Sequence, residues 1–363
     1  MKKRHSQPKF IALFVALNVT PAAFAGQVYS GVDYQYFRDF AENKGKFTPG
    51  AQNIAVVNKK GESIGTMMQN APMMDFSVVS RNGVAALVGD QYIVSVAHNV
   101  GYSGVDFGME GSNPDQHRFG YNIVKRNNYK NDSTHPYMTD YHNPRLTKFV
   151  TEAAPIEMVS NMQGSTYGDL EKYPMRVRIG SGWQFLRDDN DNGNHIAMAY
   201  NYLTAGNTFM QGWANNGEVS LSGDVRHPNQ YGPLPISGSS GDSGSPMFIY
   251  DKTAGKWLIN GVLRSGHPYQ GKENTYQIAR KNYLDEIIAG DLMTVFDFTS
   301  ASYDWTADGN GSGKLTKGGR VVTNTPLANY SLPSSGRDES FGYGGPNPYM
   351  PAQHHGKNIY FGN

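Results

Sequence analysis

Short apolar runs separated by turn residues dominate this chain, and their spacing is what most constrains its fold. The runs are four to nine residues long and alternate with turns rich in glycine, asparagine and aspartate. Such spacing is typical of all-β barrels and sandwiches, and 42 glycines with 12% aromatic residues agree with it. Two stretches, 33–43 and 281–292, instead predict short helices. The main predicted strands cover residues 54–57, 76–79, 84–88, 92–97, 176–180, 195–203, 246–250 and 257–265.

Composition excludes several function classes. The chain has no cysteine, which rules out disulfides, thiolate metal sites and a cysteine nucleophile. A net charge of +1 gives no electrostatic reason to bind nucleic acid or an anionic membrane. No H-E-x-x-H motif is present. The acidic run 188–193 starts like a calcium loop but has alanine at its twelfth position, so we interpret it as a hairpin turn. We expect no metal and no cofactor.

The N-terminus has the pattern of a secretory signal. A basic start at 2–4 precedes the apolar run 10–19, and Ala23-Phe24-Ala25 has the small-x-small form of a cleavage site. The run is too short for a stable membrane anchor. We predict a signal peptide over 1–25 and a mature chain that begins at Gly26.

The segment Gly241-Asp242-Ser243-Gly244-Ser245-Pro246 predicts a nucleophilic serine. A serine hydroxyl needs a base to take its proton and donors for the oxyanion that forms on attack. Glycine at 241 allows a sharp turn that directs the N–H groups of Gly241 and Ser243 into one space. The glycine spacing differs from the G-x-S-x-G elbow of α/β-hydrolases.

A base and an orienting acid have candidates upstream. His98 follows the apolar run 92–97 directly and so lies at the end of a predicted buried strand. In chymotrypsin-type enzymes the order along the chain is His, Asp, Ser, and four aspartates after His98 are candidates for the acid. These are Asp106, Asp115, Asp132 and Asp140. Asp140 is favoured because it leaves enough chain on either side for two barrels, but spacing alone does not decide.

Several sequence blocks resemble the S6 serine endopeptidases, the immunoglobulin A protease-type autotransporters of Gram-negative mucosal bacteria. The resemblance covers roughly residues 28–300, and its most specific blocks are 33–47, 72–78, 92–98, 149–155 and 241–246. It implies an all-β, chymotrypsin-like double β-barrel with a few short helices, followed by the start of a β-helical stalk. It also implies His98 as general base, Asp140 as its orienting acid and Ser243 as nucleophile.

The substrate pocket is predicted from position relative to Ser243. Its base in chymotrypsin-like enzymes is usually six residues earlier, here Ser237. A serine without a nearby carboxylate favours a neutral substrate side chain over Arg or Lys. The backbone of Leu263, Arg264 and Ser265 is the predicted edge for an extended substrate.

Asp242 poses a separate question. In trypsin-type enzymes the matching acid pairs with a new N-terminus after zymogen cleavage, and no activation site is visible after Ala25. The amine of a mature Gly26 or donors from loops are both candidate partners.

The predicted domains are the signal peptide 1–25, the protease domain 26–300 and a Gly/Asn/Pro-rich start of a stalk over 301–363, which has too few apolar residues for a core of its own. The alternating strands of an outer-membrane barrel are not found, so we expect no transmembrane barrel in this chain. The leading hypothesis is an exported serine endopeptidase that acts in the periplasm, at the cell surface or after secretion. Its partners are protein substrates, including extracellular host or bacterial proteins and its own precursor. The alternative is an adhesin head that is inactive or truncated as a protease.

Overall fold

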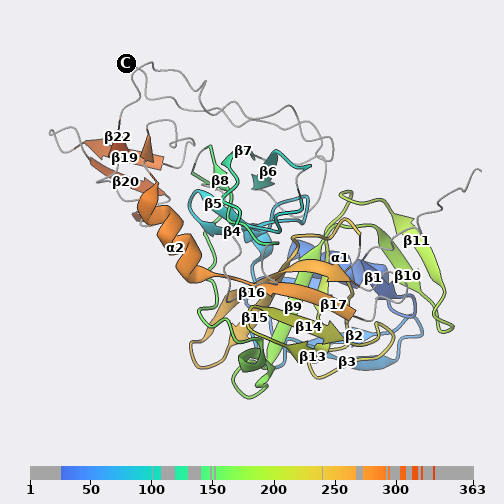
Figure 1. Ribbon diagram of the computed structural model, residues 1–363. Coiled ribbons are helices and arrows are strands. Elements are labelled where there is room, and N and C mark those ends of the chain that lie inside the picture. The colour runs from blue at the N-terminus through green and yellow to red at the C-terminus, as the bar shows by residue number, and fades with distance from the viewer. Residues whose placement is uncertain are drawn as a thin grey trace, which may run out of the picture.

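The computed structural model describes residues 26–99, 101–107, 119–129, 140–147, 149–150, 153–238, 240–266 and 273–291, and a few short strands beyond. The predicted signal peptide lies outside these residues, and so does most of the predicted stalk. Two curled antiparallel sheets form the body of the molecule (Figure 1). This confirms the predicted all-β, chymotrypsin-like double barrel with few helices.

The first sheet has the strand order β4-β5-β8-β7-β6. Its members are β4 (Ala86–Gly89), β5 (Tyr92–Val94), β6 (Gly104–Phe107), β7 (Phe119–Lys125) and β8 (Arg145–Leu146). Side chains from every strand fill its interior, among them Leu87, Ile93, Val105, Ile123 and Leu146. A separate hairpin, β2 (Ile54–Val57) and β3 (Ser63–Met67), precedes this sheet in the chain.

The second sheet has the order β12-β9-β15-β16-β17-β14-β13. Its members are β9 (Met175–Gly180), β12 (Thr204–Asn207), β13 (Met210–Ala214), β14 (Glu218–Ser222), β15 (Pro246–Asp251), β16 (Lys256–Gly266) and β17 (Glu273–Ile278). A smaller sheet joins β1 (Gln27–Tyr29), β10 (Gln184–Arg187) and β11 (Gly193–Ala197). The first described residues of the chain therefore pair with its second half, through the parallel contact of β1 with β10.

Two α-helices are described, α1 (Tyr34–Glu42) and α2 (Lys281–Gly290), and both confirm predicted helices. The carboxylate of Asp33 accepts the N–H of Gln35 at 3.0 Å and caps α1, which ends at Asn43 in a left-handed conformation. The 3₁₀ helices are Gly45–Phe47, Phe76–Val78 and Gly164–Gly168. Neither α-helix is long and apolar enough to cross a membrane. Beyond α2 the structure describes β18 (Met293–Thr294), β19 (Tyr303–Ala307), β20 (Gly313–Lys317), β21 (Arg320–Val321) and β22 (Tyr330–Ser331).

One predicted strand is wrong. Residues 76–79 form a 3₁₀ turn, because the carboxylate of Asp75 accepts the N–H of Ser77 at 2.9 Å and bends the backbone. Its apolar residues Phe76 and Val78 are buried, but outside any sheet. The ring of Phe76 lies between Phe40 of α1, with centroids 5.7 Å apart, and Phe248 of β15, at 5.9 Å. The turn thereby ties α1 to the strand that follows Ser243.

Two other predicted strands are shorter than expected. The run 92–97 is a strand only as far as Val94, and residues 97–98 turn at its end. The run 195–203 is a strand only as far as Ala197, and Tyr200 has a φ of 67°. A tyrosine in the left-handed region marks a turn, and this turn lies beside Gly241, where a Cβ would come within 3.1 Å of Cβ of Ala199.

Candidate active site

The pairing of β5 with β8 brings His98 and Asp140 together. Beyond the two strands, Ser95 and His142 exchange both backbone hydrogen bonds at 3.2 Å. His98 lies three residues after Ser95, and Asp140 lies two residues before His142. A regular antiparallel ladder would place His98 opposite residue 139, one position from Asp140, and residues 97–98 leave the ladder in a turn. The register of the first sheet thus brings the predicted base close to the predicted acid, and the turn completes their contact.

Two hydrogen bonds join these residues. The Nδ1 of His98 lies 2.7 Å from Oδ2 of Asp140, and the backbone N–H of His98 donates to Oδ1 at 2.9 Å. The His98 side chain is 46% exposed while that of Asp140 is 17% exposed, so the ring is held from one side and open on the other. Burial raises the pKa of Asp140, but the hydrogen bonds from His98 and the charge of Arg264 outweigh it and keep the net pKa below its usual value.

Asp106, the competing acid, is not part of this pair. It lies in β6, buried, with its carbonyl accepting the N–H of Arg81 at 3.2 Å. Asp115 and Asp132 lie outside the described residues. Asp140 is therefore the aspartate that the described structure joins to His98.

Asn99 connects the two sheets at the site, a contact that the sequence did not predict. Its side-chain amide donates a short hydrogen bond to the carbonyl oxygen of Ser243. A direct hydrogen bond from His98 to Ser243 is not among the contacts of the described residues. Hydrogen bonds of catalytic groups are often long without substrate. The loop that carries His98 therefore contacts the loop that carries Ser243 through Asn99, the residue that follows His98.

The backbone around Ser243 has the bends that the glycines predict. Gly241 has a φ of 86° and Gly244 a φ of 84°, both in the region that favours glycine. The N–H of Gly244 donates to the carbonyl of Leu263 at 2.7 Å, and the N–H of Ser245 closes a turn on the carbonyl of Asp242 at 2.8 Å. Within the described part of the chain, the N–H groups of Gly241 and Ser243 donate to no protein acceptor. They are the two predicted oxyanion donors.

The partner of Asp242 comes from inside the second barrel. Its Oδ2 lies 3.2 Å from a guanidinium nitrogen of Arg178 on β9, and its Oδ1 accepts the N–H of Gly182 at 2.7 Å. Both side chains of this ion pair are only 1% exposed. Of the two partners considered from the sequence, loop donors are correct in part, and Gly26 is engaged elsewhere, with its carbonyl accepting the N–H of Phe185 at 2.9 Å.

Ser237 lies beneath the catalytic loop and is fully buried. Its hydroxyl donates to the carbonyl of Gly238 at 3.1 Å, and its backbone exchanges two 3.1 Å hydrogen bonds with Gln27 of β1. The neighbouring Gly238 donates its N–H to Oδ1 of Asn274 at 2.8 Å. An uncharged base for the substrate pocket therefore stays our prediction. Asn274, which contacts Ser237 and Gly238, is a second uncharged residue at this place.

The other predicted substrate residues differ from one another. Leu263 is 1% exposed, its N–H donates to the carbonyl of Ser245 at 2.9 Å, and its carbonyl accepts from Gly244. Its backbone is thus used to hold the serine loop, contrary to the prediction that it pairs with substrate. Arg264 interrupts the pairing of β16 with β17 as a bulge and Ser265 is exposed, so these two residues keep that role as a prediction.

His142 supports the strand that presents Asp140. It is completely buried, with Nε2 2.9 Å from the hydroxyl of Tyr102 and Nδ1 3.2 Å from Oδ1 of Asn128. Burial, with a smaller contribution from the charge of Arg126, lowers the pKa of His142 to about 3. The ring is therefore neutral in the folded protein at physiological pH.

The buried His142 predicts a loss of stability in acid. The unfolded chain protonates this histidine below pH ~6.5, while the folded protein resists protonation down to about pH 3. Between these values the unfolded state binds more protons than the folded state. The unfolding free energy therefore decreases by about 1.4 kcal/mol from this group for each unit by which the pH is lowered. We expect His142→Gln to be less stable than the wild type at pH 7 but to have a shallower acid slope of unfolding free energy. Parallel slopes in urea melts from pH 7 to 4 would contradict this.

Substitution of Gly244 tests how closely the 241–245 loop packs on the first barrel. A Cβ at this position would clash with Oγ of Ser95 and the carbonyl oxygen of Val84, both in the first barrel, whereas a Cβ at Gly255 would meet nothing within 4 Å. Both glycines have positive φ, so alanine costs each about 1–2 kcal/mol in backbone strain. We expect Gly255→Ala to show only this loss in thermal melts, and Gly244→Ala to lose several kcal/mol more through the clash. Equal losses in the two variants would mean that the barrels separate easily at this contact.

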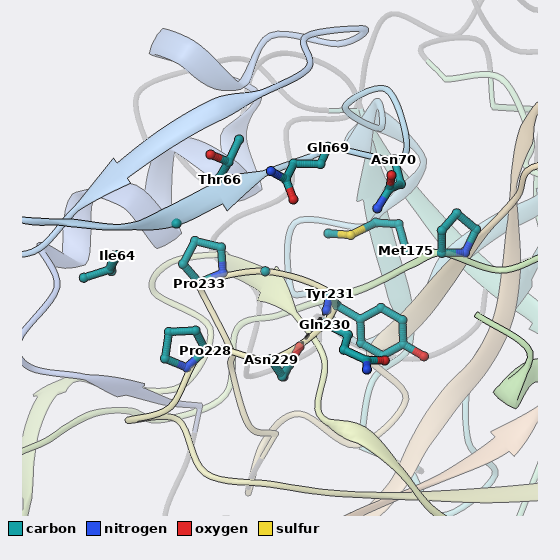
Figure 2. A pocket seen from close by; sticks show the side chains of 13 residues that line it. Ile64, Thr66, Gln69, Asn70, Met175, Pro228, Asn229, Gln230, Tyr231 and Pro233 are labelled. Atoms are coloured by element: carbon teal, nitrogen blue, oxygen red, sulfur yellow. Dashed lines mark hydrogen bonds between the residues drawn. The ribbon is translucent and has the colours of Figure 1, made fainter. Parts of the chain in front are cut away.

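A pocket lies away from these residues (Figure 2). It has a volume of about 250 Å³ between the β2–β3 hairpin and the loop around Tyr231, and none of its lining residues is charged. Met175, at the start of β9, forms part of its wall, while Gly180, at the other end of that strand, lies against Asp242. The cavity contains none of the predicted site residues.

Comparison with known proteins gives one family. A family model described as immunoglobulin A1 protease, of the peptidase S6 group, matches residues 25–282. The chain is 59% identical, over 99% of its length, to the adhesion and penetration protein autotransporter of Haemophilus influenzae. It is 33% identical, over 76% of its length, to the IgA-specific serine endopeptidase autotransporter of Neisseria gonorrhoeae. It covers 26% of the first protein and 20% of the second.

A solved structure gives the same result. The crystal structure of the Haemophilus influenzae Hap adhesin is 64% identical, with a TM-score of 0.69, over 80% of this chain and 31% of that one. The sequence blocks quoted above predict an S6 protein that resembles the Haemophilus adhesion and penetration protein and its neisserial relatives more than the immunoglobulin A1 proteases proper. The family and the closer likeness to the Haemophilus protein are confirmed.

Proposed function

The chain belongs to the peptidase S6 family of serine proteases, and from this we propose that it is a serine endopeptidase that cleaves proteins through an acyl-enzyme. It spans about a quarter of the length of the two adhesion and penetration protein autotransporters that it matches, so the activity is assigned to this segment on its own residues. The observation that carries the proposal is that the segments bearing the three predicted triad residues contact one another. His98 is fixed by two hydrogen bonds to Asp140, and the adjoining Asn99 is bonded to the backbone of Ser243.

Each residue has one role in the mechanism. Ser243 attacks the scissile carbonyl while His98 takes its proton and later returns it to the leaving amine. Asp140, kept ionised by its low pKa, holds the imidazole with Nδ1 protonated and stabilises the imidazolium. The N–H groups of Gly241 and Ser243 stabilise the tetrahedral oxyanion. Water acting as the second nucleophile releases the acyl group.

The substrates are proteins held as an extended strand along Arg264 and Ser265, with a neutral side chain directed toward Ser237. We further propose that the chain is exported through its N-terminal signal and acts in the periplasm, at the cell surface or after release. Export agrees with its relatives, which are autotransporters. Extracellular proteins and its own precursor are the proposed substrates, and residues 26–300 form the proposed protease domain.

A fluorophosphonate probe tests the proposed activity. It reacts with a serine only where base, nucleophile and oxyanion donors are assembled. We expect the purified chain to be labelled at a single site that peptide mass mapping assigns to Ser243. Absence of labelling in protein shown by circular dichroism to be folded would contradict the proposal.

Adhesion is a second candidate function, favoured by one observation. Two relatives, 59% and 52% identical to this chain, are named adhesion and penetration protein autotransporters. Host-cell binding by the Ser243→Ala variant separates the two functions. Unchanged binding would show that adhesion needs no catalysis, and lost binding would show that any adhesion depends on proteolysis.

A further inference from the structure

Arg178 is a cation enclosed within the second barrel. It lies on β9 and is 1% exposed, next to Gly180 at the strand end. Its guanidinium donates to the carbonyl of Ser237 at 3.0 Å and to Oγ of Ser245 at 2.9 Å, and it pairs with Asp242 at 3.2 Å. A charge in such a place is tolerated only when it is paired and hydrogen-bonded. These three contacts come from both sides of Ser243 and from the predicted pocket base.

The surroundings of Arg178 are shaped for the ion pair. A Cβ on Gly180 would clash with Oδ1 of Asp242, and a Cβ on Gly238 would approach the guanidinium carbon of Arg178 to 3.3 Å. Two glycines thus admit the fork of donors that only arginine provides. Asp242, fixed by Arg178 and by the N–H of Gly182, closes the turn that accepts the N–H of Ser245. Moving its carboxylate would move the backbone on which the oxyanion donors lie.

The described N-terminal residues Gly26 and Gln27 pack against β10 and Ser237. Gly26 packs on the side chain of Gln184, and Gln27 is paired to Ser237. Asp242 is already paired with Arg178 and accepts the N–H of Gly182, both from within the second half of the chain. A cleavage-generated ammonium is therefore not needed to hold this acid.

We propose that Arg178 is the internal cation that positions the 241–245 loop and Ser237, so that the catalytic site assembles without an activating cleavage. The inference rests on the proposed protease function. Arg178 contacts no reacting atom in this scheme and acts as a positioning residue. Its effect passes through Asp242 to the N–H groups of Gly241 and Ser243, and through the carbonyl of Ser237 to the pocket.

A matched pair of variants tests the position of the charge. Arg176 lies two residues earlier on the same strand and is equally buried, but it donates to the carbonyl of Tyr167 and lies beside the ring of Tyr231. We expect Arg176→Met to react with the fluorophosphonate at the wild-type rate per folded molecule. Arg178→Met should react at least 100-fold more slowly at a temperature at which it remains folded. Equal rates for the two variants would overturn the proposal.

The pH profile of Arg178→Lys gives a readout that a structural role alone would not change. A guanidinium stays charged throughout the working range, and Tyr276, which also faces Arg178 with Asp242, has a pKa raised to about 12 by burial. The wild-type labelling rate should therefore stay level from pH 8 to 10. Burial lowers the pKa of a lysine at this position, whereas the charge of Asp242 raises it, so the lysine pKa is located first by NMR titration of the folded variant. Arg178→Lys should lose about tenfold in labelling rate per pH unit above that pKa. A labelling rate that stays level through the lysine pKa would contradict the proposal even if Arg178→Met does not fold.

An N-terminal extension distinguishes the internal cation from a free amine. A chain that retains Ala25 and an added tag should be labelled at the rate of one that begins at Gly26. Labelling only after trimming to Gly26 would assign the switch to the new ammonium and overturn the role of Arg178. Because the wild type is measured first, an unlabelled wild type contradicts the proposed protease itself, whereas a labelled wild type with an unaffected Arg178→Met contradicts only this inference.

Discussion

Replacing Ser243 with alanine will lower kcat for a peptide substrate by about a millionfold, the scale seen when a triad loses its nucleophile. Alanine removes the only atom that forms the acyl bond and leaves the fold intact, since the contacts of the loop run through its backbone. Those contacts are the bond from Asn99 to the Ser243 carbonyl and the bond from Gly244 to Leu263. Substrate KM should change little, because binding depends on the pocket and the strand edge.

His98 supplies the control for this result. If the two residues act as one unit, His98→Ala alone should cost about as much as Ser243→Ala, and the double variant should lose no more than either. A surface change such as Ser63→Ala, at the exposed first residue of β3, should leave kcat unchanged. A Ser243→Ala variant that keeps 1% of kcat, or a double variant with multiplied losses, would mean that Ser243 and His98 do not share one chemical step.

The fold could be predicted wherever local pattern and burial agreed. The runs at 54–57, 176–180 and 246–250 are strands, and apolar residues of each are buried in the hydrophobic core, with Met247 in a different cluster from Phe248 and Ile249. The run at 76–79 is also apolar, but it forms no strand. Phe76 is buried because it packs between α1 and β15. A single sequence does not distinguish these two causes of hydrophobicity, since the contacts that separate them join residues far apart in the chain.

The triad candidates could be found from sequence because each lies in a local motif. Ser243 is in a glycine-rich turn and His98 ends a strand, while Asp140 needed the family resemblance to be separated from Asp106. The supporting contacts had no such motif. Arg178 is one of two arginines that alternate with apolar residues in β9, a pattern that also fits a strand with one exposed face, and Asn99 is one asparagine after a turn. Their roles follow from contacts with residues 59 to 144 positions away in the chain.

Replacing Asp140 with asparagine will lower kcat by about 10⁴ near neutral pH with little effect on stability. The carboxylate accepts from both Nδ1 and the backbone N–H of His98, so it fixes the tautomer in which Nε2 is free to take a proton. An amide can retain one bond as acceptor while its NH₂ group donates to Nδ1. That arrangement places the proton on Nε2, where it faces the serine and blocks proton transfer.

Asp106→Asn is the matched control for Asp140→Asn, because Asp106 is the other described aspartate considered for the role and is buried in β6. Its kcat per folded molecule should stay within a few-fold of wild type, as measured by active-site titration and peptide hydrolysis. If Asp106→Asn loses 10⁴ and Asp140→Asn does not, the orienting acid is misassigned. If both variants remain active, His98 is held well enough by other contacts, and the short bond to Asp140 has no catalytic consequence.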